Sequence, residues 1–228
     1  MKFTILSLFP EMFVGPFNYS IIKKAAAKKL IEINLVNIRD FATDKYKTVD
    51  DKPYGGGAGM IMKVDIINKA IQKVKSPAFV KTSAGRQKSK VKSKERVILL
   101  DPKGKLFTQR DAKRLKKYEH LIFVCGHYEG VDARVSKLVD EVISVGNYVL
   151  TGGEIPTMII VDAVTRLVPG VIKKESAENE SFTDALLEYP QYTRPAEYKR
   201  MKVPKILLSG NHEEIKKWRE KHEKRIIY

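Results

Sequence analysis

The feature that most restricts the fold is a regular alternation of apolar runs and helical segments up to about residue 170. Short runs rich in Val, Ile, Leu and Phe are separated by stretches whose apolar residues lie three or four positions apart. This alternation favours an α/β domain with a mostly parallel sheet. The expected strands cover residues 2–9, 31–38, 95–102, 120–126 and 140–146, and the expected helices cover 18–30, 64–74, 108–118, 131–139 and 155–164. Thr108 is expected to be the N-cap of the helix over 108–118.

The pattern changes from about residue 171. The sequence from there to residue 204 is polar, contains three prolines and shows no strand pattern. Residues 209–228 predict a helix, which Asn211 can cap because Glu214 follows three positions later. We therefore expect an α/β domain over 1–170, a linker over 171–186 and a small helical domain over 187–228.

The chain is strongly basic. It has 43 Lys and Arg against 27 Asp and Glu, a net charge of +16 and a pI of about 9.7. A small domain usually carries a net charge of roughly 2 to 8 for solubility, so the excess favours a polyanionic partner such as nucleic acid. Residues 81–96 hold seven basic residues and one acid, and this run fits a solvated loop or a phosphate contact equally well.

Several classes of protein are disfavoured by missing patterns. No apolar run is long enough to span a membrane, and the N-terminus reads better as a buried strand than as a signal peptide. The dinucleotide fingerprint, the phosphate-binding loop and the usual histidine metal motif do not occur. The single cysteine, Cys125, reads as a buried strand residue rather than a nucleophile, and it favours a reducing cytosol. No metal site is predicted.

Three glycine-containing loops follow the carboxyl ends of three expected strands. Their sequences are DPKGK (101–105), CGHYEG (125–130) and VGNYVLTGG (145–153). Ligands of open parallel sheets bind at this edge, and glycines let backbone groups approach a ligand closely. The loops hold few cations, so an adenosine-like ligand without phosphates fits, and S-adenosylmethionine is one. Three ordinary glycine turns are the alternative interpretation.

Six blocks of sequence, in order, carry a resemblance that covers nearly the whole chain. The chain resembles the bacterial tRNA (guanine-N1)-methyltransferase family in VDDKPYGGGAGMIM, CGHYEGVDAR, SVGNYVLTGGEIP, DAVTRLVPGV, ESFTDALLEYPQYTRP and LLSGNHEEIKKWR. The resemblance implies a SPOUT-type α/β domain with a C-terminal trefoil knot, plus the small helical domain, which would bind tRNA. It also implies a cytoplasmic homodimer with its active site between subunits.

The activity implied by the resemblance is transfer of a methyl group from S-adenosylmethionine to N1 of the guanine immediately 3′ of the tRNA anticodon, which guards the reading frame. The resemblance leaves open whether Mg²⁺ is needed. It maps the cofactor pocket onto Pro102, Gly126, Tyr128, Glu129, Gly130, Ser144, Val145, Gly146, Tyr148, Leu150, Gly152 and Gly153.

Guanine N1 carries a proton at neutral pH, so methylation needs a base for N1 and a cation for the charge that develops on O6. The resemblance assigns Arg166 to O6 and brings Glu129, Asp162 and Glu188 to the target guanine. An ordinary ion pair between Asp162 and Arg166, four residues apart, is the alternative for Asp162. The base is expected to be Glu180, which stands before a Ser-Phe pair where the family has aspartate.

Glu180 is one of three departures from the family. His127 stands where many relatives carry arginine, and Glu188 where aspartate is common. These changes keep open a catalytically weak or inactive RNA-binding homologue. A SPOUT enzyme acting on ribosomal RNA is a further alternative, which the YGGGAGMIM and SGNHEEIKKW blocks disfavour.

Overall fold

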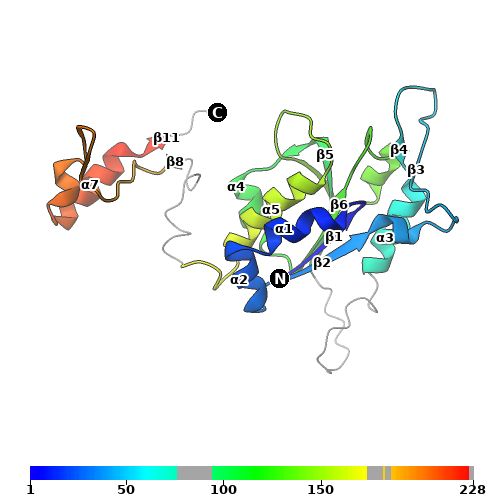
Figure 1. Cartoon of the computed structure of the whole chain (residues 1–228), viewed down its shortest axis with the longest axis horizontal. Coiled ribbons are helices and arrows are strands. Elements are labelled where there is room, and N and C mark those ends of the chain that lie inside the picture. Colours follow the sequence, from blue (N-terminus) through cyan, green and yellow to red (C-terminus); the bar gives the residue numbers. More distant parts are fainter. Residues whose placement is uncertain (76–93, 174–181, 183–185, 226–228) are drawn as a thin grey trace. The chain divides into compact units, whose positions relative to one another are not determined.

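The computed structural model describes residues 1–75, 94–173, 182 and 186–225 (Figure 1). Contacts divide the chain into two compact units, Met1–Ile172 and Lys173–Tyr228, and each is described by itself. None of the helices in the described ranges is long and apolar enough to cross a membrane. The predicted basic run lies largely in 76–93, outside the described residues.

The first unit is built on a five-stranded sheet in the order β2-β1-β6-β5-β7. All four neighbouring pairs are parallel, which confirms the predicted α/β class. The strands are β1 (Lys2–Ser7), β2 (Glu32–Asn37), β5 (Glu95–Leu106), β6 (His120–Cys125) and β7 (Glu141–Ser144). A short antiparallel pair, β3 (Asp50–Asp51) with β4 (Ile61–Met62), lies outside this sheet.

Helices cover both faces of the sheet, as the parallel connections require (Figure 1). One face packs on α1 (Val14–Phe17), α2 (Ser20–Ala27), α4 (Gln109–Leu115) and α5 (Glu154–Arg166). The other packs on α3 (Val64–Lys75) and on the 3₁₀ turns η2 (Ile38–Phe41) and η4 (Ala133–Lys137). A further 3₁₀ turn, η1 (Pro10–Phe13), precedes α1.

Alternate residues of the central strands supply the two cores. Phe3 and Ile5 of β1 face one cluster, whereas Leu6 faces the other. In β6, Phe123 and Val124 divide in the same way, and each is fully buried. Because both faces of the sheet are covered, residues on both sides of the central strands are largely apolar.

Strand β5 departs from the predicted pattern. It was expected to end at residue 102, but it continues to Leu106 and pairs with β7 twice. The pairing through Ile98–Leu100 and the pairing through Lys105–Leu106 are separated by a jump in register. Residues 101–104 therefore form an excursion from the sheet edge, which sequence periodicity does not predict.

Other boundaries moved by a few residues. Helix α4 ends at Leu115 rather than 118, although the predicted N-cap at Thr108 is confirmed by a capping box with Asp111. The helix expected over 131–139 is only the 3₁₀ turn η4, and α5 extends to Arg166.

The second unit has one helix of more than two turns among its described residues, α7 (His212–His222). Asn211 caps α7 by accepting a hydrogen bond from the Glu214 backbone N–H at 3.3 Å. The expectation of no strand pattern after residue 171 was wrong, because two-residue strands pair there. The remaining elements are η5 (Lys205–Leu208), β8 (Leu186–Leu187) with β11 (Lys224–Arg225), and β9 (Glu197–Tyr198) with β10 (Met201–Lys202).

Candidate cofactor pocket and active site

A pocket of about 230 Å³ lies at the carboxyl ends of β5, β6 and β7. The three loops that follow these strands form its wall, together with the first turn of α5. Its lining residues are Leu100–Lys103, Gly126–Val131, Ile143–Gly146, Tyr148–Gly153 and Pro156.

All twelve residues that the resemblance assigned to the cofactor pocket line this one cavity. These residues come from three separate stretches of sequence, and the folded chain brings them together around one pocket. Their contact with a cofactor stays a prediction. The sequence interpretation did not assign Asp101, Lys103 or Pro156, which also line the pocket.

Gly153 shows why the last loop needs glycine. Its backbone N–H donates to the Gly126 carbonyl at 2.8 Å, so the loop after β7 lies directly against the loop after β6. A Cβ at position 153 would lie 2.7 Å from the Cα of Cys125, which is closer than real side chains approach backbone. The trefoil knot stays a prediction, and this close passage of two chain segments supports it.

The loop after β6 has an unusual backbone. Tyr128 adopts a φ of +59°, which a bulky residue takes only where its surroundings hold it. Its hydroxyl accepts a hydrogen bond from Arg39 at 3.2 Å. The His127 ring packs edge-on against both Phe9 and Tyr128, at 4.8 and 4.9 Å. These contacts fix a loop that would otherwise relax.

His127, which was noted above as a departure from the family, lies at the pocket. It lines the pocket, and its Nδ1 is buried without a hydrogen-bond partner among the described residues. A buried imidazole nitrogen without a partner is costly, so a polar ligand atom there would satisfy it. An effect of His127 on cofactor or tRNA contact stays a prediction.

A buried carboxylate lies behind the pocket. Glu154 is 2% exposed, and it accepts a hydrogen bond from the Ser7 hydroxyl at 2.7 Å. Burial raises the pKa of the neighbouring Cys125 thiol, and the charge of Glu154 raises it further. Cys125 is thus a neutral buried residue, as predicted, and not a nucleophile. Sequence interpretation missed Glu154, because a glutamate at a helix start normally signals only a favourable helix dipole.

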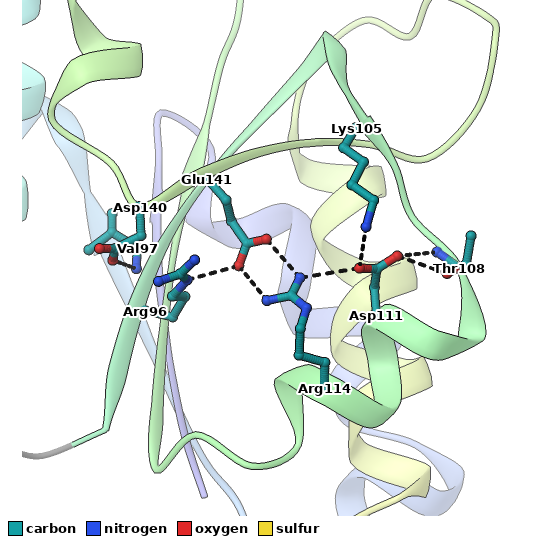
Figure 2. A network of polar contacts seen from close by, with 8 residues as sticks. All are labelled: Arg96, Val97, Lys105, Thr108, Asp111, Arg114, Asp140 and Glu141. Carbon is teal, nitrogen blue, oxygen red and sulfur yellow. Dashed lines mark hydrogen bonds and ion pairs between the residues drawn. The ribbon is translucent and has the colours of Figure 1, made fainter.

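An ionic network lies next to the β5 excursion and includes Lys105, the residue that follows it (Figure 2). Arg114 of α4 donates to both Glu141 oxygens, at 3.1 and 2.7 Å, and so ties α4 to β7. Asp111 accepts hydrogen bonds from Lys105 at 3.1 Å and from the Thr108 hydroxyl at 2.8 Å. Through Lys105, the network is connected to the segment that carries Pro102 into the pocket.

The network also sets two ionisation states. Burial raises the pKa of Asp111, but hydrogen bonds from Thr108, Lys105 and Arg114 outweigh it and leave that pKa below its usual value. The hydrogen bonds to Glu141 raise the pKa of Arg114. Both groups are therefore charged throughout the neutral range.

The pocket wall suits an organic ligand that carries little negative charge. It is formed largely by backbone, glycines and the apolar side chains of Tyr148, Val149 and Leu150, and its one lysine is Lys103. Among the described residues, no group of three His, Cys, Asp or Glu is placed to hold a metal ion. A nucleoside with a short polar chain fits these walls, as S-adenosylmethionine would.

The predicted guanine-binding residues lie in different places. Glu129 lines the pocket, whereas Asp162 and Arg166 lie near the far end of α5. Pro156 lines the pocket, and at about 1.5 Å of rise per residue Arg166 lies about 15 Å further along the helix axis. Glu188 belongs to the second unit, where it accepts a hydrogen bond from Gln191 at 3.0 Å. Glu180 lies outside the described residues.

The fold and the pocket define a class: an α/β protein with a parallel sheet and a pocket for a small ligand at the carboxyl ends of its strands. Comparison with known families shows which family of this class the chain belongs to. The family model described as tRNA (Guanine-1)-methyltransferase TrmD matches residues 1–227. The chain therefore belongs to this family, and it is a methyltransferase of the SPOUT class.

Curated relatives agree with this assignment. A tRNA (guanine-N(1)-)-methyltransferase of Carboxydothermus hydrogenoformans is 55% identical over 224 residues, 97% of this chain and 82% of that protein. Proteins with the same name from Geobacter sp. strain M21 and Clostridium botulinum are 56% and 54% identical. They are matched over 98% and 96% of this chain and over 85% of each relative.

Proposed function

We propose that this methyltransferase transfers a methyl group from S-adenosylmethionine to N1 of the guanine immediately 3′ of the tRNA anticodon, and so guards the reading frame. The observation that carries the proposal is the pocket in which all twelve predicted residues meet. The net charge of +16 suits a tRNA substrate, and such a substrate places the activity in the cytoplasm.

The cofactor would be held by the three loops. Backbone groups of Gly126, Gly152 and Gly153 would contact its polar edges, and Tyr148 and Leu150 would cover its base. When bound, S-adenosylmethionine supplies a methyl group that its sulfonium already activates, so the protein needs only to orient the two reactants and to manage one proton.

Two residues would manage the charge on the guanine. The Arg166 guanidinium would stabilise the negative charge that develops on O6, and the Glu180 carboxylate would take the N1 proton. Glutamate retains the acid-base group of the family's aspartate, but its extra methylene costs rotamer freedom when it is ordered. Glu180→Ala should abolish turnover with cofactor affinity nearly unchanged, whereas an equal loss of cofactor binding would point to a structural role.

A second copy of the chain would complete the site. Ile155, Ile159, Asp162 and Arg166 are spaced to form one stripe along α5. Ile155 and Ile159 are 44% and 42% exposed, and Asp162 is exposed too. An exposed apolar stripe that continues into Asp162 and Arg166 suits a two-fold interface, in which each Arg166 reaches the other subunit's pocket.

Mixing two variants of strongly reduced activity tests the shared site. If Arg166 serves the partner's pocket, random exchange between Glu129→Ala and Arg166→Ala dimers rebuilds one intact site in every mixed dimer. Half of the dimers are mixed, so the activity returns to roughly a quarter of the wild-type value. No recovery, with subunit exchange shown by a mass-tagged subunit, would place both residues in one chain's own site.

The test of the proposed function is transfer of labelled methyl from S-adenosylmethionine to a tRNA transcript with guanine 3′ of the anticodon, beside a twin with adenine there. Labelling of the guanine transcript alone supports the substrate, the cofactor and the position together. No labelling of either transcript, with tRNA still bound, would mean an inactive homologue. Parallel assays with EDTA and with added Mg²⁺ would decide whether the reaction needs the ion.

A further inference from the structure

The glycine loop at residues 55–59 lies against the loop that carries Glu129. Next to it in the chain, the Met60 carbonyl accepts a hydrogen bond from the Glu129 backbone N–H at 3.1 Å. The Met62 backbone N–H donates to the Gly130 carbonyl at 3.0 Å, and the Met62 side chain is fully buried in the core. The position of Gly59 relative to Glu129 is therefore fixed from both sides.

Gly59 itself touches the Glu129 side chain. A Cβ built on Gly59 would lie 2.7 Å from Oε1 and 2.9 Å from Cδ of Glu129, and closer still to its Cγ. The contact therefore includes the carboxylate and not only the stem of the side chain. The bare Cα of Gly59 is what leaves room for Glu129 in this rotamer.

Few polar contacts fix the orientation of the Glu129 side chain. Its residue is exposed, and among the described residues no hydrogen bond or ion pair reaches its carboxylate. A glutamate in such a setting samples several rotamers unless packing selects one. Packing against Gly59 is one contact that limits where the carboxylate can point.

We propose that Gly59 is a positioning residue: its Cα is the surface on which the Glu129 carboxylate rests, so that the carboxylate faces the pocket. This rests on the proposed function, in which Glu129 contacts the target guanine. The glycine loop thus acts on the reaction through Glu129, without itself supplying a chemical group.

The same loop offers a matched control. Gly56 has a φ of +79°, almost the same as the +77° of Gly59, but a Cβ at Gly56 would meet nothing within 4 Å. Alanine at either position therefore adopts a similarly unfavourable φ. Only Gly59→Ala also displaces Glu129, so the difference between the two variants isolates the contact.

The experiment measures kcat, KM for tRNA and cofactor affinity for Gly56→Ala, Gly59→Ala, Glu129→Ala and the double variant Gly59→Ala/Glu129→Ala. We expect Gly59→Ala to lower kcat roughly tenfold to a hundredfold, because a displacement of about 1 Å has effects of that size. Gly56→Ala should stay within about twofold of wild type. In the Glu129→Ala background, adding Gly59→Ala should change kcat by less than about twofold.

Two results would overturn the proposal. Equal losses in Gly56→Ala and Gly59→Ala would mean that backbone strain alone matters. Losses that multiply in the double variant would mean that Gly59 acts independently of Glu129. Thermal melting of all four proteins shows whether any loss is one of folding.

The experiment distinguishes a failure of the proposed function from a failure of the positioning role of Gly59. If the wild-type protein methylates no tRNA, that function is wrong, but the contact can still be measured by calorimetry with S-adenosylmethionine, because Glu129 lines the pocket. Gly59→Ala should then weaken cofactor binding and Gly56→Ala should leave it unchanged. Identical affinities for the two variants would reject the positioning role by this second route.

Discussion

The two units of the chain place their apolar residues in opposite ways. Met1–Ile172 buries two clusters on the faces of its sheet, including twelve large side chains that are less than 2% exposed. In Lys173–Tyr228, none of the residues whose burial is described is buried, and Tyr192, Tyr198 and Leu208 are each at least half exposed. The first unit therefore has the interior that a preformed pocket requires, whereas the second presents aromatic and cationic side chains at its surface.

The difference fits the roles proposed for the two units, cofactor binding for the first and tRNA binding for the second. A cofactor pocket needs walls that hold their shape without the ligand, and the first unit supplies them from buried strand ends and an ionic brace. A surface that grips RNA uses exposed aromatic rings and arginines instead. In the second unit, Tyr189 and Tyr192 pack near Trp218 at 6.4 Å, and the Arg219 guanidinium lies 5.0 Å from the centre of the Tyr189 ring.

The largest expected contrast is in stability. Ile71 of α3 is 1% exposed in the core, and Ile215 of α7 is only partly buried. Ile71→Ala should destabilise the protein by about 2–5 kcal/mol, because it removes buried methyl groups and leaves a cavity. Ile215→Ala should cost about 1 kcal/mol, because much less apolar surface is lost from burial. Urea unfolding monitored by circular dichroism measures both, and equal losses would contradict the comparison.

The next effect is a pH dependence in the first unit. The pKa of His120 is lowered from 6.5 to about 4, chiefly by burial and to a smaller extent by Lys2, while Glu32 opposes the shift. Below pH 6.5, His120 binds a proton in the unfolded chain but not in the folded chain. The free energy of unfolding therefore falls as the pH drops towards 4. A shift of this size corresponds to a loss on the order of 3 kcal/mol.

His120→Gln is the matched variant for this effect. It can keep a hydrogen bond to the Thr4 hydroxyl, which lies 2.8 Å from the imidazole Nε2 in the wild type. Its stability should change less than that of the wild type between pH 6.5 and 5, where most carboxylates remain ionised. Parallel curves for the two proteins would show that His120 is not the titrating group.

Weakening the ionic network should have a smaller effect, which can be measured both as stability and as cofactor affinity. Asp111→Asn removes a charge-assisted capping box and should cost about 1–2 kcal/mol at neutral pH. Because the pKa of Asp111 is lowered in the folded protein, this stability is present above its ordinary value of 3.8 and is lost as the pH falls below it. Cofactor affinity should fall too, because Lys105 and the excursion with Pro102 lose their support. Unchanged affinity would confine the network to stability.

Periodicity predicted the parts of the fold that depend on local pattern. The parallel strands and α3 follow from apolar spacing, and the N-cap at Thr108 follows from the preference for threonine at a helix start. The excursion of β5 was missed because it depends on a second pairing with β7, which is a contact between distant residues. Two-residue strands such as β9 carry too few residues to show a period.

The candidate site also contains residues that were predicted from the sequence and residues that were missed. The pocket residues were assigned through a resemblance, because no local pattern connects the three loops across the sheet edge. Glu154 and the contact of Gly59 with Glu129 were missed, since burial of a charge and closeness in space are properties of the folded chain. Glu180 lies outside the described residues, so its role as base stays a prediction.

The smallest expected effect tests the second unit's surface. Arg219→Gln should raise KM for tRNA about fivefold, close to 1 kcal/mol, and leave cofactor affinity unchanged, because it removes one exposed cation and its contact with Tyr189. Arg110→Gln removes the same charge from an exposed site on α4 and serves as the control. The salt dependence of tRNA binding should lose about one unit of slope in Arg219→Gln alone. If both variants weaken binding alike, the net charge of the whole chain attracts tRNA, and the exposed rings of the second unit do not select where it binds.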